Sequence, residues 1–196
     1  MSRIIAGQAG GRRLAVPGGS ATRPTTDRVR EALFSSLVAW AGSSHLDVAE
    51  QLSGISVLDL FAGSGAVGLE AASRGADTVV LVERDSATAR LIEKNIAVTG
   101  LDAVVRCQSA AAYVATPGPS FDLIFADPPY PMGTDEVSAL VASLVDRGRL
   151  VDDGLVVVER SSRGPAPDWP AALSDVWAKR YGETVLYYAR RSEPEQ

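Results

Sequence analysis

The chain has 196 residues, of which 46% are hydrophobic and 22% charged, and its formal net charge is −5. This length suits one domain that buries on the order of 70% of its unfolded surface, and the acidic balance argues against a protein that coats nucleic acid in general. No segment approaches the roughly 18 apolar residues that span a bilayer, and no apolar leader opens the chain, so a cytoplasmic protein without a membrane partner is expected.

The N-terminal segment is basic. Residues 1–30 hold six arginines and one acid, a charge of +5, which leaves −10 for the rest of the chain. Residues 3–6 and 12–16 are separated by glycines and predict a short β-hairpin. A basic segment on an acidic body predicts binding to a polyanion, and arginine favours bidentate phosphate contacts and stacking on unpaired bases. Simple solvation is the alternative. The expected RNA contacts are Arg3, Arg12, Arg13, Arg23 and Arg28.

After this segment the pattern changes to helices and strands in alternation. Thr25 or Thr26 is expected to cap a helix whose apolar residues recur from Val29 to Ala41. Strands are then expected at 55–61, 78–83, 103–107, 121–126 and 154–159, and helices at 65–74, 86–98, 109–115 and 134–146. Such alternation predicts an α/β fold with a Rossmann-like, doubly wound, mostly parallel seven-stranded sheet.

Two further features complete the expected architecture. Residues 175–181 and 183–190, joined at Gly182, predict a C-terminal antiparallel hairpin at the sheet edge, beyond which 192–196 form a tail. Cys107, the single cysteine, excludes an intrachain disulfide and a multi-cysteine metal site, so no metal is expected. Because it ends an apolar strand, we expect it to be a small core residue. His45, the only histidine, is expected in a solvated loop.

A glycine-rich turn follows the first strand of the alternating region. Gly63, Gly65 and Gly68 match G-x-G-x-x-G, and Glu83 ends the next strand, where an acid that binds ribose belongs. A nicotinamide-dependent oxidoreductase is therefore one candidate, and a turn that serves packing alone is another. Asp59, just before the turn, would repel a pyrophosphate but suits the cationic amino group of S-adenosylmethionine. A simple turn cap remains the alternative role of Asp59.

A second motif follows the strand 121–126. Asp127, Pro128, Pro129 and Tyr130 form a rigid turn rich in acceptors, because proline has no backbone N–H and a fixed φ. The Asp127 carboxylate and the Pro128 carbonyl can accept both hydrogens of an exocyclic amine, while the Tyr130 ring can stack on a planar base. An ordinary turn that ends a strand is the alternative. Since parallel strands place their carboxyl ends on one rim, Asp127 is expected beside Asp59 and Glu83.

With these motifs in this order, the chain resembles class I S-adenosylmethionine-dependent amino-methyltransferases. Residues 3–7, 11–14 and 23–31 resemble the RsmD family more narrowly, and the resemblance spans about residues 3–190. It implies methyl transfer to the exocyclic N2 of a guanine in bacterial 16S rRNA, with free 16S rRNA or the assembling small ribosomal subunit as partner. The cofactor-binding residues it implies are Asp59, Phe61, Gly63, Gly65, Glu83, Ser109, Ala110 and Asp127.

The resemblance also implies a division of the chain and leaves rival substrates open. Residues 1–42 are expected to form an RNA-binding extension of hairpin and helix, and 43–191 the methyltransferase domain. Similar turns occur in DNA adenine-N6 and cytosine-N4 methyltransferases and in protein glutamine methyltransferases, so the turn alone predicts methylation of an amine. The arginines argue against glutamine as acceptor, and the chain has little spare length for a DNA target-recognition segment.

Overall fold

The computed structural model describes residues 2–18 and 26–191, and it confirms the expected fold. A seven-stranded sheet has the order β5-β4-β3-β6-β7-β9-β8. Five strands run parallel: β3 (Ser56–Asp59), β4 (Thr78–Glu83), β5 (Val104–Cys107), β6 (Phe121–Ala126) and β7 (Leu150–Ser161). The expected antiparallel hairpin, β8 (Asp175–Tyr181) and β9 (Thr184–Arg190), completes the edge. The strand order reverses between β3 and β6, the position at which doubly wound sheets bind ligands.

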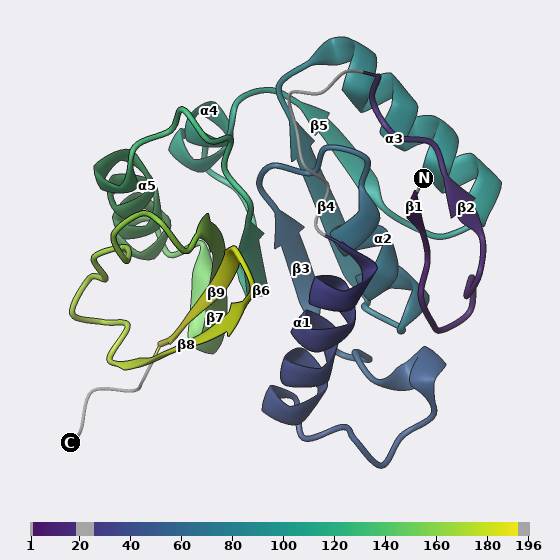
Figure 1. The fold of residues 1–196 in the computed structure, drawn as a ribbon, viewed down its shortest axis with the longest axis horizontal. Helices are drawn as coiled ribbons and strands as arrows, with labels where there is room; N and C mark the ends of the chain where they lie inside the picture. The colour runs from purple at the N-terminus through teal and green to yellow at the C-terminus, as the bar shows by residue number, and fades with distance from the viewer. Residues whose placement is uncertain (1, 19–25, 192–196) are drawn as a thin grey trace.

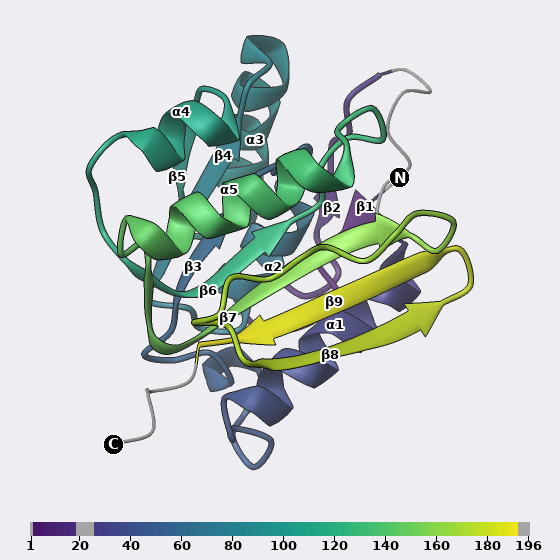
Figure 2. The same ribbon diagram turned by 90° about the vertical axis from the view of Figure 1, so that its left-hand side faces the viewer.

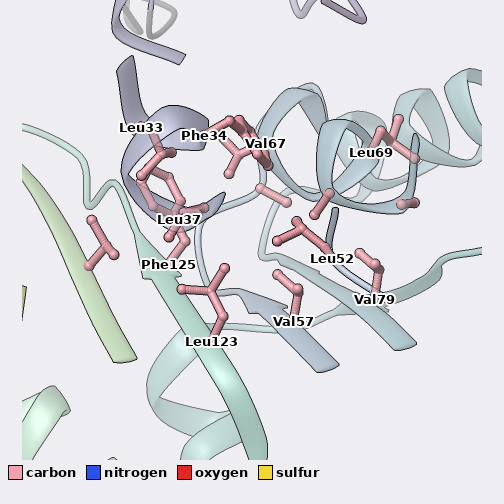
Figure 3. Packing of buried hydrophobic residues seen from close by; sticks show 14 of the residues in the cluster. Leu33, Phe34, Leu37, Leu52, Val57, Val67, Leu69, Val79, Leu123 and Phe125 are labelled. Carbon is pink, nitrogen blue, oxygen red and sulfur yellow. The ribbon is translucent and has the colours of Figure 1, made fainter. Parts of the chain in front are cut away.

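Helices cover both faces of this sheet (Figures 1 and 2). They are α1 (Asp27–Trp40), α2 (Ala66–Ser73), α3 (Ser86–Thr99), α4 (Ala110–Ala115) and α5 (Thr134–Asp146), and a 3₁₀ turn, η1, spans Val48–Glu50. Side chains alternate along each strand, so Val57 packs in the cluster formed with α1, α2 and α3, whereas Leu58 packs in the cluster with α4 and α5. Figure 3 shows the first cluster, in which Phe34 of α1 lies beside Val67 of α2 and Leu37 of α1 lies beside Phe125 of β6.

The N-terminal hairpin joins the first of these hydrophobic clusters. Its strands, β1 (Ser2–Arg3) and β2 (Arg13–Leu14), are shorter than expected, and both Ile4 and Leu14 are buried in that cluster. The Glu70 carboxylate of α2 accepts hydrogen bonds from Ile5 N–H at 2.6 Å and Ala6 N–H at 3.1 Å. The hairpin is thus fixed to α2 through its backbone. Arg23 and the tail 192–196 lie outside the described residues.

Local chemistry explains most of the element boundaries. Thr26 is the cap of α1, since its hydroxyl accepts from Val29 N–H at 3.4 Å, and α3 ends at Gly100 with a φ of 67°.

The prediction that Cys107 is a core residue is wrong: the thiol is exposed, because β5 is the outer strand of the sheet and presents side chains to solvent. His45 is exposed, as expected. Within the described part of the chain, every helix is too short or too polar to cross a membrane.

Candidate active site

Three carboxylates lie at the carboxyl ends of three adjacent strands, β4, β3 and β6. Asp59 ends β3, Glu83 ends β4 and Asp127 follows β6, and β3 lies between the other two strands. This is the rim at which the sequence predicted that they would meet. The register pairs Asp59 with Leu81 of β4 and with Phe125 of β6, so the three acids lie within about two residues of one level of the sheet.

The glycine turn between β3 and α2 needs two of its three glycines for backbone reasons. Gly63 has a φ of 55° and Gly65 a φ of 79°, values that side chains disfavour. A methyl group on Gly63 would meet only Phe61 O, at 4.0 Å, so the backbone there borders open space that a ligand can approach. Gly68 has a different role. A Cβ there would lie 2.2 Å from Leu81 Cδ2, so this glycine permits close packing of α2 on β4.

Asp59 is a buried acid with unused hydrogen-bonding capacity. Only 1% of the residue is exposed, and its Oδ1 has no hydrogen-bond partner among the described residues. Burial raises the pKa of Asp59 to about 7; backbone N–H groups of Gly68 and Phe61 oppose the rise, and the charge of Glu83 adds to it. Since a buried acceptor without a partner costs about 1–3 kcal/mol, the site favours a ligand that brings a donor or a positive charge. The amino group of S-adenosylmethionine fits this requirement.

The remaining expected cofactor residues surround the same rim. Glu83 accepts hydrogen bonds from Gly63 N–H at 3.1 Å and from Asp85 N–H at 2.9 Å, which holds its carboxylate beside the glycine turn. Ser109 caps α4, because its hydroxyl oxygen accepts from Ala112 N–H at 3.2 Å. Ala110 is buried and Phe61 half-buried, both packing in the cluster of α4 and α5. Their contacts to a cofactor stay a prediction.

The turn after β6 opens onto a cleft of about 820 Å³. Tyr130 is 67% exposed, so its ring is free to meet a planar group. The Pro129 carbonyl accepts from Met132 N–H at 2.9 Å, and Arg160 donates to Met132 O at 2.8 Å, so the turn is anchored to β7. The walls of the cleft come from this turn, the start of α1, the end of β7 and the tip of the β8–β9 hairpin.

Acidic side chains lie deep in this cleft, and exposed basic side chains lie at its edge. Asp127 is half-buried and Glu159, at the end of β7, is 8% exposed, so the floor holds two acids, with the half-buried Arg160 bound to Met132 O beside them. Arg28, Arg163 and Arg180 are exposed at its edge and form a basic rim. Arg163 pairs with Glu183, and Arg180 Nε donates to Gly182 O at 3.0 Å. Sequence reasoning missed Glu159, Arg163 and Arg180. The run of charge at 159–163 was the available signal, but only the fold places it opposite Asp127.

The N-terminal arginines have different surroundings from one another. Arg12 donates to the carbonyls of Val98 at 2.8 Å and Thr99 at 2.9 Å, and so binds the C-terminal end of α3. Arg30 is fully buried, donating to Asp27 at 2.6 Å and to Arg3 O at 2.9 Å. Arg3, Arg13 and Arg28 are exposed like Arg12, but their guanidinium groups do not bind the end of α3. Of the N-terminal arginines that the structure describes, Arg28 alone lines the cleft, although Arg3 reaches the start of α1 through Asp27.

Comparison with known proteins agrees with this architecture. The family model described as conserved hypothetical protein 95 matches residues 2–190. The chain is 39% identical to the ribosomal RNA small subunit methyltransferase D of Escherichia coli, over 98% of this chain and 92% of that protein. It is 32% identical to the putative rRNA methyltransferase YlbH of Bacillus subtilis, over 96% and 99%.

A solved structure supports the same relationship. The putative methyltransferase yhhF from Escherichia coli superposes with a TM-score of 0.82 and 34% identity, covering 98% of this chain and 99% of that one. The match extends over the hairpin, the sheet and the C-terminal strands together. By sequence and by structure, the chain belongs to the RsmD family of methyltransferases.

Proposed function

We propose that this protein transfers a methyl group from S-adenosylmethionine to the exocyclic N2 of a guanine in 16S rRNA, with free rRNA or the assembling small subunit as its partner and the cytoplasm as its location. The observation that carries this proposal is the cleft with an acidic floor and a basic rim. A polyanion is attracted by the rim, whereas the floor attracts a group that donates hydrogen bonds. A nucleobase amine on an RNA strand combines both properties.

The cofactor would be held on the β3 and β4 side of the rim. Asp59 would attract its amino group, Glu83 would accept from the ribose hydroxyls, and Gly63 would allow close approach of the backbone. Ser109 and Ala110 would border the adenine. When bound, S-adenosylmethionine supplies an electrophilic methyl group. An ionised Asp59 is a poor neighbour for a pyrophosphate, which argues against a nicotinamide cofactor.

On the cleft side, the turn after β6 would orient the base. Asp127 and the Pro128 carbonyl accept hydrogen bonds from the amine, which favours a more tetrahedral nitrogen, and the Asp127 carboxylate stabilises the positive charge that develops there. Tyr130 replaces the stacking that the base loses when it leaves its neighbours. After transfer the methylated amine loses a proton, which the Asp127 carboxylate can accept. The basic rim, extended by Arg3, Arg13 and the predicted contact Arg23, would hold the flanking phosphates.

Methylation of small-subunit rRNA tests this function. The purified protein, labelled S-adenosylmethionine and unmethylated 16S rRNA, alone or in small subunits, should yield N2-methylguanosine when the digested RNA is analysed by mass spectrometry. Asp127→Ala should lower the rate by roughly 100-fold or more, because it removes a charge that stabilises the transition state. N6-methyladenosine or N4-methylcytidine as the only product, or unchanged turnover in Asp127→Ala, would overturn the proposal.

A further inference from the structure

We infer that Glu159 selects guanine over the other amine-bearing bases by accepting a hydrogen bond from the ring N1–H beside the target N2. The inference rests on the proposed methyl transfer to an exocyclic base amine and adds the group that chooses the base. Glu159 is the second acid of the cleft floor, and it lies outside the four residues of the turn after β6.

The sheet places Glu159 beside Asp127. β6 and β7 are parallel neighbours in which Phe125 pairs with Val157 and Ala126 with Val158. Continuing this register by one residue brings Asp127 level with Glu159. Neighbouring strands lie about 4.8 Å apart, so the two side chains can reach adjacent donors of one ring.

Both carboxylates also leave the sheet on the same face. Phe125 and Val157 both pack in the cluster beneath α1, and side chains two residues apart on a strand share a face. The start of α1, with Arg28 and Val29, forms part of the cleft wall on that face. Asp127 and Glu159 therefore converge on one space under α1.

Glu159 is too buried for water to solvate its carboxylate as it would that of a surface residue. The four residues before it, 155–158, are fully buried, and Glu159 itself is 8% exposed while still lining the cleft. A carboxylate in such a place needs hydrogen-bond donors. Glu159 already has an interaction within the protein, and because a carboxylate can accept about four hydrogen bonds, that interaction is compatible with a further hydrogen bond from a base.

The hydrogen-bonding groups of the bases explain how a carboxylate at this position can distinguish guanine from adenine and cytosine. The guanine amine lies between two ring nitrogens, of which N3 is an acceptor and N1 carries a hydrogen, so N1–H and the N2 hydrogens form one row of donors on the N1 side. In adenine and in cytosine the ring nitrogen next to the amine is an acceptor, and it would face the Glu159 carboxylate with no hydrogen between them. Two opposed acceptors in a buried site cost free energy, and such repulsion gives specificity. The pair Asp127 and Glu159 thus fits guanine alone among these bases.

An RNA fragment with 2-aminopurine in place of the target guanine tests this, because 2-aminopurine keeps the N2 amine but has neither N1–H nor the O6 carbonyl, and the change of preference in a Glu159 variant isolates the contact to N1–H. Affinity and methylation rate should both be measured for each RNA. The wild-type protein should prefer guanine by about 10- to 100-fold, the cost of one opposed pair. In Glu159→Gln the preference should shrink by about tenfold, since the amide can accept from guanine N1–H or donate to the bare nitrogen of 2-aminopurine.

Glu93→Gln, an exposed change on α3 outside the cleft, is the matched control and should keep the wild-type preference. S-adenosylmethionine affinity reports whether Glu159→Gln folds, and the wild-type comparison of the two RNAs needs no variant. Equal use of both RNAs by the wild-type protein would overturn the proposed role of Glu159 but not the proposed function. An unchanged preference for guanine in folded Glu159→Gln would have the same meaning. Failure to methylate either RNA would instead overturn the proposed function and this inference with it.

Discussion

At the scale of single residues, Asp59 makes cofactor binding depend on pH. Its pKa is raised to about 7 by burial, so in the free protein the carboxyl is largely neutral under mildly acidic conditions. Because the pKa of Asp59 is higher in the folded than in the unfolded state, the protonated carboxyl stabilises the fold. This contribution to the free energy of unfolding is complete below about pH 4 and is lost as the pH rises to about 7. A bound cation has the opposite effect, because it favours the ionised carboxylate of Asp59 over the neutral carboxyl.

Cofactor affinity should therefore rise with pH. From about pH 5.5 to about pH 7 the ionised fraction of Asp59 increases roughly 15-fold, while the amino group of the cofactor stays mostly protonated, so the dissociation constant should fall by about 10- to 15-fold. Titration calorimetry with S-adenosylhomocysteine in buffers of different ionisation enthalpy measures both the affinity and the proton release. Asp59→Asn should bind more weakly and lose the slope. A wild-type affinity that is flat with pH would show that Asp59 does not contact the cofactor's charge.

Tyr130 offers a second residue-scale prediction. Because its ring is 67% exposed, Tyr130→Ala should leave the free energy of unfolding within about 0.5 kcal/mol of wild type. Its loss should weaken RNA binding by about 1–3 kcal/mol if the ring stacks on a base. Tyr130→Phe keeps the ring and should restore the affinity. Equal RNA affinity in the Ala and Phe variants would contradict stacking.

At the scale of elements, α2 connects the glycine turn to the N-terminal hairpin through one buried acid. Glu70 is fully buried, and besides Ile5 and Ala6 its carboxylate accepts from Arg74 Nε at 2.9 Å. Glu70→Ala would leave two backbone N–H groups and a nearly buried guanidinium without this acceptor. We expect the free energy of unfolding to fall by about 3–5 kcal/mol.

Denaturant unfolding of Glu70→Ala, with the exposed Glu50→Ala as control, measures this cost. The same contacts mean that removing residues 2–16 should destabilise the whole protein, because Ile4 and Leu14 leave the core with the hairpin. A truncated protein with wild-type stability would show instead that the hairpin is an independent appendage. The division at residue 42 stays a prediction that this experiment addresses.

The elements that the sequence predicted well are those with strong local signals. β4, β6 and α5 have the expected bounds, since apolar runs, turn residues and caps mark both of their ends. The error at Cys107 arose because an apolar run does not reveal whether a strand lies at the centre or the edge of a sheet. The rim of the cleft was missed for a related reason: only tertiary structure brings the β8–β9 tip, with Arg180, toward Asp127.

At the scale of the whole molecule, an acidic protein must bind a polyanion through a local surface. The chain carries −5 overall, so RNA affinity depends on where its arginines are concentrated. Arg163 and Arg180 lie at the mouth of the cleft, and their contacts with Glu183, Ser162 and Gly182 O are exposed contacts at the hairpin tip and in the segment that follows β7. Surface contacts of this kind contribute little to folding, so these two side chains can be removed with little effect on stability.

Replacing both Arg163 and Arg180 with Ala should reduce RNA affinity and flatten its dependence on salt. Each lost phosphate contact lowers the slope of log affinity against log salt concentration by about 0.7–0.9, so the double variant should lose about 1.4–1.8. Replacing Lys94 and Arg147 with Ala removes the same charge from exposed sites on α3 and at the end of α5 and should change the slope far less. Binding of a 16S rRNA fragment at several salt concentrations measures both slopes, with S-adenosylmethionine affinity as the check on folding. If the two double variants lose affinity and slope equally, RNA responds to net charge alone, and the cleft rim is not its binding surface.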